Sequence, residues 1–380
     1  MILVENGPAG SPAVFREPRR IVVAHAADEV LPALEELDRA QRQGAWLAGW
    51  IGYEAGMALE PRLRPLMRRS PGEPLLAFGV YASPLPAEDF LAETRNMAEE
   101  VRIAPFTPLV SREDYEASFR QLADYIRRGD CYQVNLTFPL RGRLLEGTAA
   151  GLYGALARVQ PVEHGAFVDL GVGPAILSRS PELFFSLDCD GRIETRPMKG
   201  TAPRHPDPAR DRALADALRE DEKTRAENLM IVDLLRNDIG RIARIGSVRV
   251  TELFKVEPLE TLHQMTSRTV GELAERLGLA GLIPALFPCG SVTGAPKIRA
   301  MEIIAELEPH PRGVYCGSIG WMAPDGSAAF IVAIRTLRLL EGGDLLMNVG
   351  GGVVHDSTAE GEWEEALWKA RFADPSRICG

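Results

Sequence analysis

The chain lacks the features that would place it in a membrane or in an oxidising compartment. No apolar run reaches the roughly 18–20 residues that a membrane-spanning helix needs, and residues 1–10 lack the basic-then-apolar order of a signal peptide. The five cysteines are scattered, odd in number and without a Cys-x-x-Cys pair, which favours reduced thiols and no zinc site. We therefore expect a cytoplasmic protein with no membrane contact.

An excess of positive charge is also missing. The formal net charge is −10, which argues against a general nucleic-acid surface or a surface for anionic membranes, although a local basic pocket for a small anion is compatible with it. The 380 residues are 46% hydrophobic and 25% charged, the balance of an ordinary globular chain with a large core. Neither an internal repeat nor a low-complexity segment is visible.

Hydrophobic periodicity and turn residues predict mixed helices and strands. Helices are expected over residues 27–43, 112–128, 151–159, a long region ending near 238, and 359–372; strands are expected over 21–24, 45–53, 75–81, 132–138, 165–170, 175–178, 183–187, 317–323, 328–339 and 345–349. The close spacing of the strands favours antiparallel pairing over βαβ repeats. Residues 1–20, rich in Gly, Pro and Arg, are expected to form a loosely structured lead-in. Ser111 precedes two acidic residues, as an N-cap does, and marks the best candidate boundary within the chain.

Carboxylates on two predicted helices could bind a cation. Glu227 precedes the apolar run 229–235, and a helix that is apolar nearly all round is expected to be buried. Glu362, Glu365 and Lys369 share one face of the last helix. Buried carboxylates need a partner, and Mg²⁺ takes one or two of them together with waters. For residues 362–369 an exposed helix with salt bridges is the alternative.

Three elements could hold an anion. Residues 288–297 form a Gly-rich loop that enters a helix, with Pro296 suited to a first-turn position, but the loop lacks the Gly-Lys-Ser/Thr of a P-loop. Residues 348–354 carry three successive glycines without dinucleotide-binding spacing; they allow close approach of a ligand, or a tight bend in a sheet. Arg335, in an otherwise apolar strand, requires a carboxylate partner from the protein or from a substrate. His263 could be a donor in a site or a satisfied core residue.

Lys199 is the residue of most chemical interest. Pro197 and Gly200 flank it and shape the backbone around it. Burial or nearby positive charge would lower the pKa of this lysine and make it a nucleophile. The alternative is a surface lysine in a polar loop.

Taken together, these motifs resemble the chorismate-utilising enzymes, which include anthranilate synthase component I, aminodeoxychorismate synthase component I, and the isochorismate and salicylate synthases. The matching stretches occur in family order at residues 132–135, 178–182, 197–201, 227–238, 262–263, 290–297, 315–317, 335, 350–352 and 362–369. The resemblance implies an α+β fold of two packed antiparallel β-sheets flanked by helices. It also implies that residues 1–110 contribute to the same core and that residues 111–373 form the chorismate-binding catalytic region.

Two positions discriminate between the branches of this family. Isochorismate and salicylate synthases carry a water-activating lysine where this chain has Gln133, and anthranilate synthases typically carry alanine where it has Lys199. With lysine at the second position, the chain resembles aminodeoxychorismate synthase component I. That enzyme aminates chorismate to 4-amino-4-deoxychorismate, a precursor of 4-aminobenzoate and folate. There the lysine attacks C2 as the 4-hydroxyl leaves, and ammonia then adds at C4 and releases it. Anthranilate synthase component I and a non-catalytic chorismate-binding subunit are the alternatives.

The resemblance also implies a role for each matching residue. Glu182 would be the general acid/base, and Glu227 and Glu365 would bind Mg²⁺ with support from Glu362 through water. The residues that would line the substrate pocket are Ser291, His263, Tyr315, Arg335, Gly350, Gly351, Gly352 and Lys369. Since the chain ends soon after its last predicted helix, ammonia is expected from a separate glutamine amidotransferase subunit or from solution.

Overall fold

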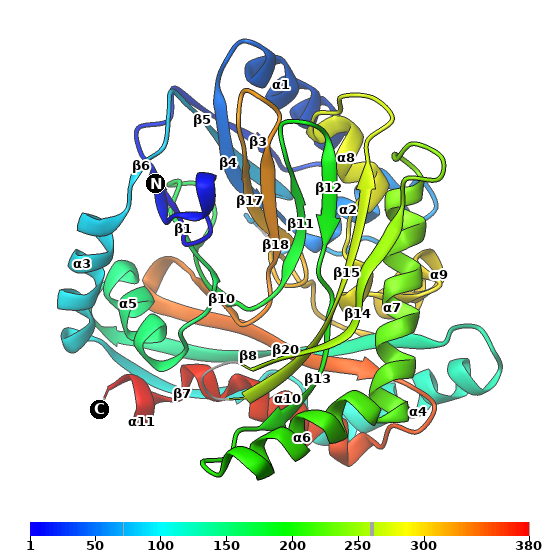
Figure 1. Ribbon diagram of the computed structural model, residues 1–380. Coiled ribbons are helices and arrows are strands. Elements are labelled where there is room, and N and C mark those ends of the chain that lie inside the picture. Colours follow the sequence, from blue (N-terminus) through cyan, green and yellow to red (C-terminus); the bar gives the residue numbers. More distant parts are fainter. Residues whose placement is uncertain (71, 259–261, 380) are drawn as a thin grey trace.

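The computed structural model describes residues 1–70, 72–258 and 262–379, and within these ranges the strands form two ten-stranded sheets (Figure 1). The first sheet has the order β16 (Gly294–Ala295), β8 (Gln133–Glu146), β20 (Asp344–Val353), β19 (Thr336–Leu339), β10 (Ala175–Ser180), β9 (His164–Val168), β1 (Ile2–Val4), β2 (Ala13–Phe15) and β6 (Leu85–Pro86), with β7 (Arg102–Pro108) also paired to β8. The second has the order β13 (Met198–Pro203), β15 (Leu262–Glu272), β12 (Arg192–Thr195), β11 (Leu183–Leu187), β18 (Ala328–Val332), β17 (Ser318–Met322), β4 (Trp46–Ile51), β5 (Leu76–Tyr81) and β3 (Arg20–Ala24), with β14 (Arg249–Pro258) also paired to β15. The pairings between these strands are antiparallel, which confirms the predicted fold class.

Helices surround the two sheets (Figure 1). They are α1 (Val30–Arg42), α2 (Tyr53–Leu59), α3 (Glu88–Met97), α4 (Arg112–Arg127), α5 (Ala149–Val159), α6 (Pro208–Glu220), α7 (Glu222–Gly240), α8 (Leu279–Leu286), α9 (Lys297–Leu307), α10 (Ala359–Ala370) and α11 (Pro375–Ile378). Helix α10 packs on β20 and α7 packs on β15, so each sheet has one of these helices against a strand that is paired on both sides. No helix in the described part of the chain is long and apolar enough to cross a membrane.

Capping residues set the helix starts that matter for the site. The Ser111 hydroxyl accepts a hydrogen bond from the backbone amide of Asp114, so α4 begins where the N-cap pattern predicts. The long helical region predicted before residue 238 is two helices. Asp221 ends α6 and caps α7 by accepting from the amide of Thr224, at 2.7 Å.

The prediction of a loose lead-in at residues 1–20 is wrong. Strands β1 and β2 form a hairpin within the first sheet, and β1 also pairs with β9. Ile2 and Phe15 are completely buried, because this short segment fills the space between the sheets despite its many Gly and Pro residues. Propensity alone does not report such tertiary burial.

The chain crosses from one sheet to the other at two neighbouring points. Strand β10 of the first sheet continues into β11 of the second through Glu182, and β18 of the second continues into β19 of the first through Arg335. The amide of Val332 donates to the carbonyl of Glu182 at 3.0 Å, and the amide of Arg179 donates to the carbonyl of Arg335 at 2.9 Å. The predicted single strand over 328–339 is therefore wrong, because it breaks at Arg335, whose φ of 49° is left-handed.

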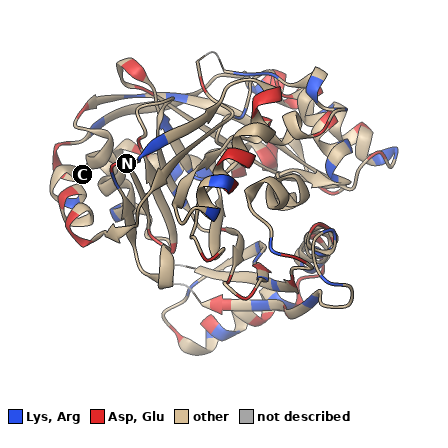
Figure 2. Cartoon of the chain, turned by 90° about the horizontal axis from the view of Figure 1, so that it is seen from above, with Lys and Arg blue, Asp and Glu red and all other residues tan. Residues whose placement is uncertain are grey.

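Charged residues of both signs are interspersed along the chain, as the blue and red segments in Figure 2 show. Within the described residues, blue and red alternate along most elements, in agreement with the absence of a positive net charge.

Candidate active site

The glycine triplet lies inside β20, and side chains from other elements converge on it. A Cβ at Gly351 would lie 2.7 Å from Oε2 of Glu362 and 3.4 Å from Nζ of Lys369. A Cβ at Gly352 would lie 2.8 Å from Nε2 of Gln133. Successive strand residues face opposite sides, so polar groups approach the strand from both of its faces. The triplet provides close approach within a paired strand, and the alternative of a tight bend is wrong.

Lys199 lies in β13 at this convergence and not in a polar loop, since its Nζ would be 3.4 Å from a Cβ at Gly352. The next residue, Gly200, has a φ of 78° and packs so closely that a Cβ there would lie 2.2 Å from Cγ2 of Thr224 on α7. Burial lowers the pKa of Lys199, and the positive charge of Lys369 acts in the same direction. The carboxylate of Glu227 opposes the shift more than any other neighbouring charge. The lysine is thus held near carboxylates but keeps a larger fraction of free amine than an exposed lysine.

Glu182, at the first crossing between the sheets, is only 6% exposed. Its Oε1 has no hydrogen-bond partner within the described residues. Burial raises the pKa of this carboxyl to about 7, while a hydrogen bond from the Ser291 hydroxyl and the charge of Lys199 both act to lower it. A carboxyl with a pKa near neutrality can donate and recover a proton at physiological pH.

Two carboxylates of α10 meet over Gly351. Glu365 pairs with Lys369 at 2.7 Å, and Glu362 accepts a hydrogen bond from the Ser357 hydroxyl at 2.7 Å. Burial raises the pKa of Glu362, and the negative charge of Glu365 adds to the shift. Such mutual repulsion is relieved by a cation, and Mg²⁺ requires only one or two carboxylates beside its waters. The residues present therefore fit a magnesium ion at this point.

Glu227 is half-buried on α7, but the prediction that this helix is buried all round is wrong. Its buried positions form one stripe that includes Asn228, Ile231 and Leu235, whereas Leu229 is 44% exposed. Within the described ranges, no three His, Cys, Asp or Glu side chains are close enough together to form a ready-made metal cage. Glu227 contributes its charge to the surroundings of Lys199.

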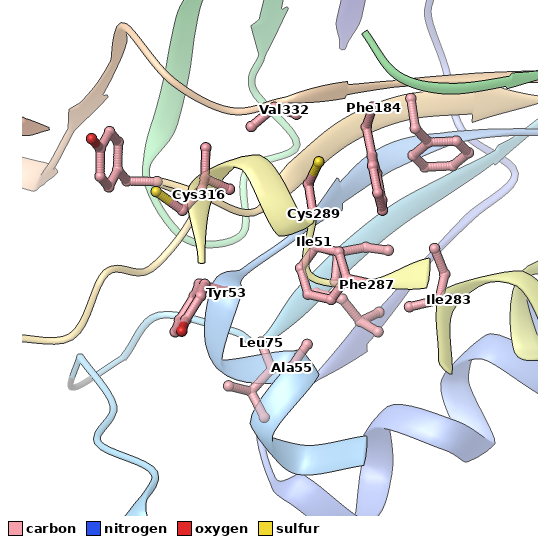
Figure 3. Packing of buried hydrophobic residues seen from close by; sticks show 14 of the residues in the cluster. Ile51, Tyr53, Ala55, Leu75, Phe184, Ile283, Phe287, Cys289, Cys316 and Val332 are labelled. Carbon is pink, nitrogen blue, oxygen red and sulfur yellow. The ribbon is translucent and has the colours of Figure 1, made fainter. Parts of the chain in front are cut away.

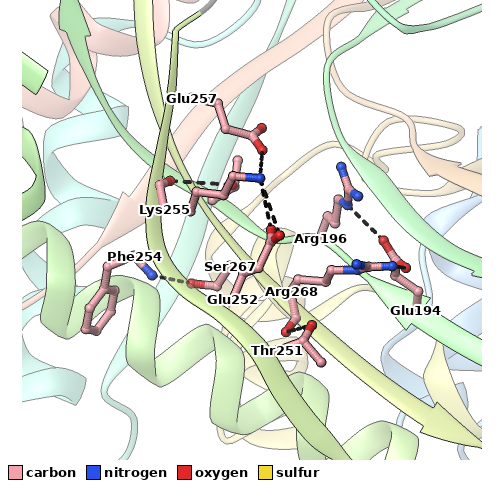
Figure 4. A network of polar contacts seen from close by, with 10 residues as sticks. Glu194, Arg196, Thr251, Glu252, Phe254, Lys255, Glu257, Ser267 and Arg268 are labelled. Atoms are coloured by element: carbon pink, nitrogen blue, oxygen red, sulfur yellow. Dashed lines mark hydrogen bonds and ion pairs between the residues drawn. The ribbon is translucent and has the colours of Figure 1, made fainter.

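A cavity of about 1420 Å³ opens beside this group and is lined in part by Pro181, Met198, Arg335 and Lys369. Its walls are basic, but several of the cations are neutralised. Figure 4 shows two of the lining cations, Arg196 and Arg268, both paired with Glu194. Beside them Lys255, which is not a lining residue, pairs with Glu252 and with Glu257.

Arg335 differs from these paired cations. Among the described residues its guanidinium has no hydrogen bond or ion pair, and burial alone lowers its pKa. An uncompensated guanidinium at the wall of a cavity is suited to a carboxylate of a ligand.

Of three further predicted residues, all of them buried, His263 and Ser291 have side-chain partners within the protein. His263 is 3% exposed, and its Nε2 lies 2.9 Å from Oδ1 of Asp211, beyond the end of β13. Tyr315 is 5% exposed, and burial raises the pKa of its phenol well above the usual value. Ser291 is buried between Glu182 and Cys289. The contacts of His263 tie it to α6 and not to the group around Lys199.

Pro296 is the N-cap of α9 and does not occupy its first turn, since Gly294 and Ala295 pair with β8 as a short strand. Gln133, which the sequence singled out as a discriminating position, is completely buried, and both atoms of its amide lack a partner in the described chain. Sequence reasoning missed one polar residue of this region, Arg312. It is 1% exposed and reaches the carbonyls of Asn135 and Val292, and no local pattern distinguishes it from a surface arginine.

Comparison with known proteins identifies this arrangement. The profile of the chorismate binding enzymes matches residues 2–374, almost the whole chain. This chain belongs to the chorismate-binding enzyme family. The expectation drawn from the site motifs is thereby confirmed at the level of the family.

Individual relatives carry two different names. Aminodeoxychorismate synthase component 1 of Escherichia coli (strain K12) is 46% identical over 260 residues, which are 68% of this chain and 56% of that protein. Anthranilate synthase component 1 of Streptomyces coelicolor is 37% identical over 372 residues, 97% of this chain and 68% of that protein. The matched region thus spans little more than half the length of the Escherichia coli relative.

A solved structure confirms the fold of this chorismate-binding enzyme. Anthranilate synthase component I from Streptococcus pneumoniae TIGR4 superposes with a TM-score of 0.80 at 26% identity, covering 96% of this chain and 91% of that one. Similarity at this level supports the family architecture of two packed sheets.

Proposed function

We propose that this protein is an aminodeoxychorismate synthase component 1, which aminates chorismate at C4 in the route to 4-aminobenzoate and folate. The observation that carries the proposal is the placement of Lys199, whose amine lies beside the glycine floor with its pKa lowered by burial. The similarity to the Escherichia coli protein of that name supports the same branch of the family.

The chemistry follows from two residues. The free amine of Lys199 attacks C2 of chorismate, both double bonds of the ring shift by one position, and the C4–O bond breaks. Glu182 supplies the proton with which the hydroxyl leaves as water, since a raised pKa keeps this carboxyl protonated in part at neutrality. Ammonia then forms a bond to C4, both double bonds shift back, and the C2–N bond to Lys199 breaks. The covalent route divides one difficult displacement into two easier ones.

Other groups would bind and orient the substrate. Arg335, which lacks a protein carboxylate, would pair with a carboxylate of chorismate. Glu362, Glu365 and Glu227 would hold Mg²⁺, which when bound neutralises part of the charge on the ring carboxylate. Gln133 would present a neutral amide beside Lys199, at the position where isochorismate and salicylate synthases carry the lysine that activates water.

Ammonia would come from a separate glutamine amidotransferase subunit, as the designation "component 1" of the relatives suggests. The test is incubation of the protein with chorismate, ammonium and Mg²⁺, followed by chromatography of the products. We expect 4-amino-4-deoxychorismate, which an added lyase converts to 4-aminobenzoate. Fluorescent anthranilate with release of pyruvate in the absence of a lyase would refute the proposal.

Anthranilate synthase is the second candidate because the Streptomyces coelicolor relative matches along nearly the whole chain. Lys199 is the feature that argues against it. A non-catalytic chorismate-binding subunit is the third reading, and turnover equal to that of buffer would support it.

A further inference from the structure

A buried thiol lies next to the hydroxyl that contacts Glu182. Sγ of Cys289 is 3.2 Å from Oγ of Ser291, and the Ser291 hydroxyl lies near enough to the carboxyl of Glu182 to act on its pKa. The three residues are 3%, 6% and 6% exposed, so water does not compete freely for these contacts. They therefore form a short polar chain in an otherwise apolar environment.

The surroundings hold the thiol in place. Cys289 lies beside Phe184 within the main hydrophobic cluster, and Ile51 and Phe287 are close to it (Figure 3). Behind it, the Thr293 hydroxyl donates to the backbone carbonyl of Cys289 at 2.9 Å, which closes the loop over residues 289–293. The sulfur thus has little freedom to turn away from Ser291.

We propose that Cys289 is a positioning residue that acts on Glu182 through Ser291. The thiol donates its hydrogen to Oγ of Ser291, and the serine hydrogen is thereby directed at the carboxyl of Glu182. A serine hydroxyl has one hydrogen, so a neighbour that occupies its lone pair determines where that hydrogen points. Burial raises the pKa of the Cys289 thiol to about 12, which keeps its hydrogen in place at physiological pH.

The direction of the Ser291 hydrogen affects how readily Glu182 releases its proton. The importance of this effect for catalysis rests on the proposed function. A donor aimed at the carboxylate favours the ionised form, whereas burial favours the protonated form. Cys289 would therefore keep Glu182 able to release its proton near neutrality. Without this orientation, Glu182 should retain the proton to higher pH.

The experiment measures the titration of Glu182 in the free protein, with no need for turnover. Infrared difference spectra of the protonated carboxyl band are recorded across pH. Subtraction of the spectra of Glu182→Gln removes the bands of other buried acids such as Glu54. Because a donor to a charged group contributes about 1.5–3 kcal/mol, Ser291→Ala should raise the midpoint by about 1–2 pH units. Cys289→Ala should raise it by about half to one unit, as only the orientation of the donor is lost.

Two variants make the result specific. Cys289→Ser keeps a donor and should restore a midpoint close to that of the wild type. Cys131→Ala removes a different buried thiol, in the main core but without a contact to Ser291, and should leave the midpoint unchanged. An unshifted or lowered midpoint in Cys289→Ala, or an unshifted one in Ser291→Ala, would overturn the inference. Failure of the chorismate assay with these shifts present would refute only the proposed function.

Discussion

The buried carboxyl of Glu182 should weaken the fold at alkaline pH, and replacement by glutamine should remove this penalty. The carboxyl has a pKa of about 7 in the folded chain against an ordinary value of 4.5. Below about pH 4.5 it is protonated in both states and costs nothing. Between these two values the unfolded chain releases the proton more readily, so stability falls as pH rises, and above about pH 7 the loss is constant. At about 1.4 kcal/mol per unit, the full penalty is about 3 kcal/mol.

The assay is urea unfolding of wild type and Glu182→Gln, followed by tryptophan fluorescence at about pH 5, 7 and 8.5. The difference in unfolding free energy should change in favour of the variant by about 2.5 kcal/mol from pH 5 to pH 8.5, since glutamine cannot ionise and a small part of the penalty is already present at pH 5. Any constant offset reflects packing and is not part of the prediction. Glu93→Gln, an exposed position on α3, controls for the same chemical change on the surface. A difference independent of pH would show that burial does not raise the pKa of Glu182 in the folded protein. In a separate assay, Glu182→Gln should lose about 10²–10⁴-fold in turnover.

Three other substitutions, one of them paired with a control, test the rest of the site. Lys199→Ala should abolish the covalent adduct that mass spectrometry detects when wild type is mixed with chorismate without ammonia; an adduct that persists in the variant would exclude this nucleophile. Gly351→Ala places a Cβ 2.7 Å from Oε2 of Glu362 and should raise the Mg²⁺ concentration needed for half-maximal activity about tenfold or more. The control is Gly350→Ala, whose Cβ would meet the backbone carbonyl of Leu136 at 2.2 Å. This variant should instead lower the unfolding temperature. Arg335→Ala should weaken chorismate binding about 10²-fold or more, measured by calorimetry, because it removes an unshared guanidinium; an unchanged affinity would assign the substrate carboxylate to another residue.

The sequence by itself determined the family and most of the elements, because both depend on local patterns. Capping at Ser111 and hydrophobic periodicity suffice to place α4, and the motifs around Lys199 and Glu182 retain their order along the chain. Local patterns do not predict burial that depends on contacts between residues far apart in the sequence. Residues 1–20 are rich in Gly, Pro and Arg, yet they supply β1 and β2 to the first sheet, between β9 and β6.

Only the tertiary structure decided how the candidate site is assembled. Arg335 was expected within a strand, but it lies where the chain passes from one sheet to the other, next to the crossing that carries Glu182. Such crossings depend on pairing between strands that are distant in sequence, and no local signal reports them. The same holds for Cys289 and Gln133, whose meaning comes from neighbours more than a hundred residues away. Spacing in sequence specified which groups are present; packing of the two sheets determined which of them meet.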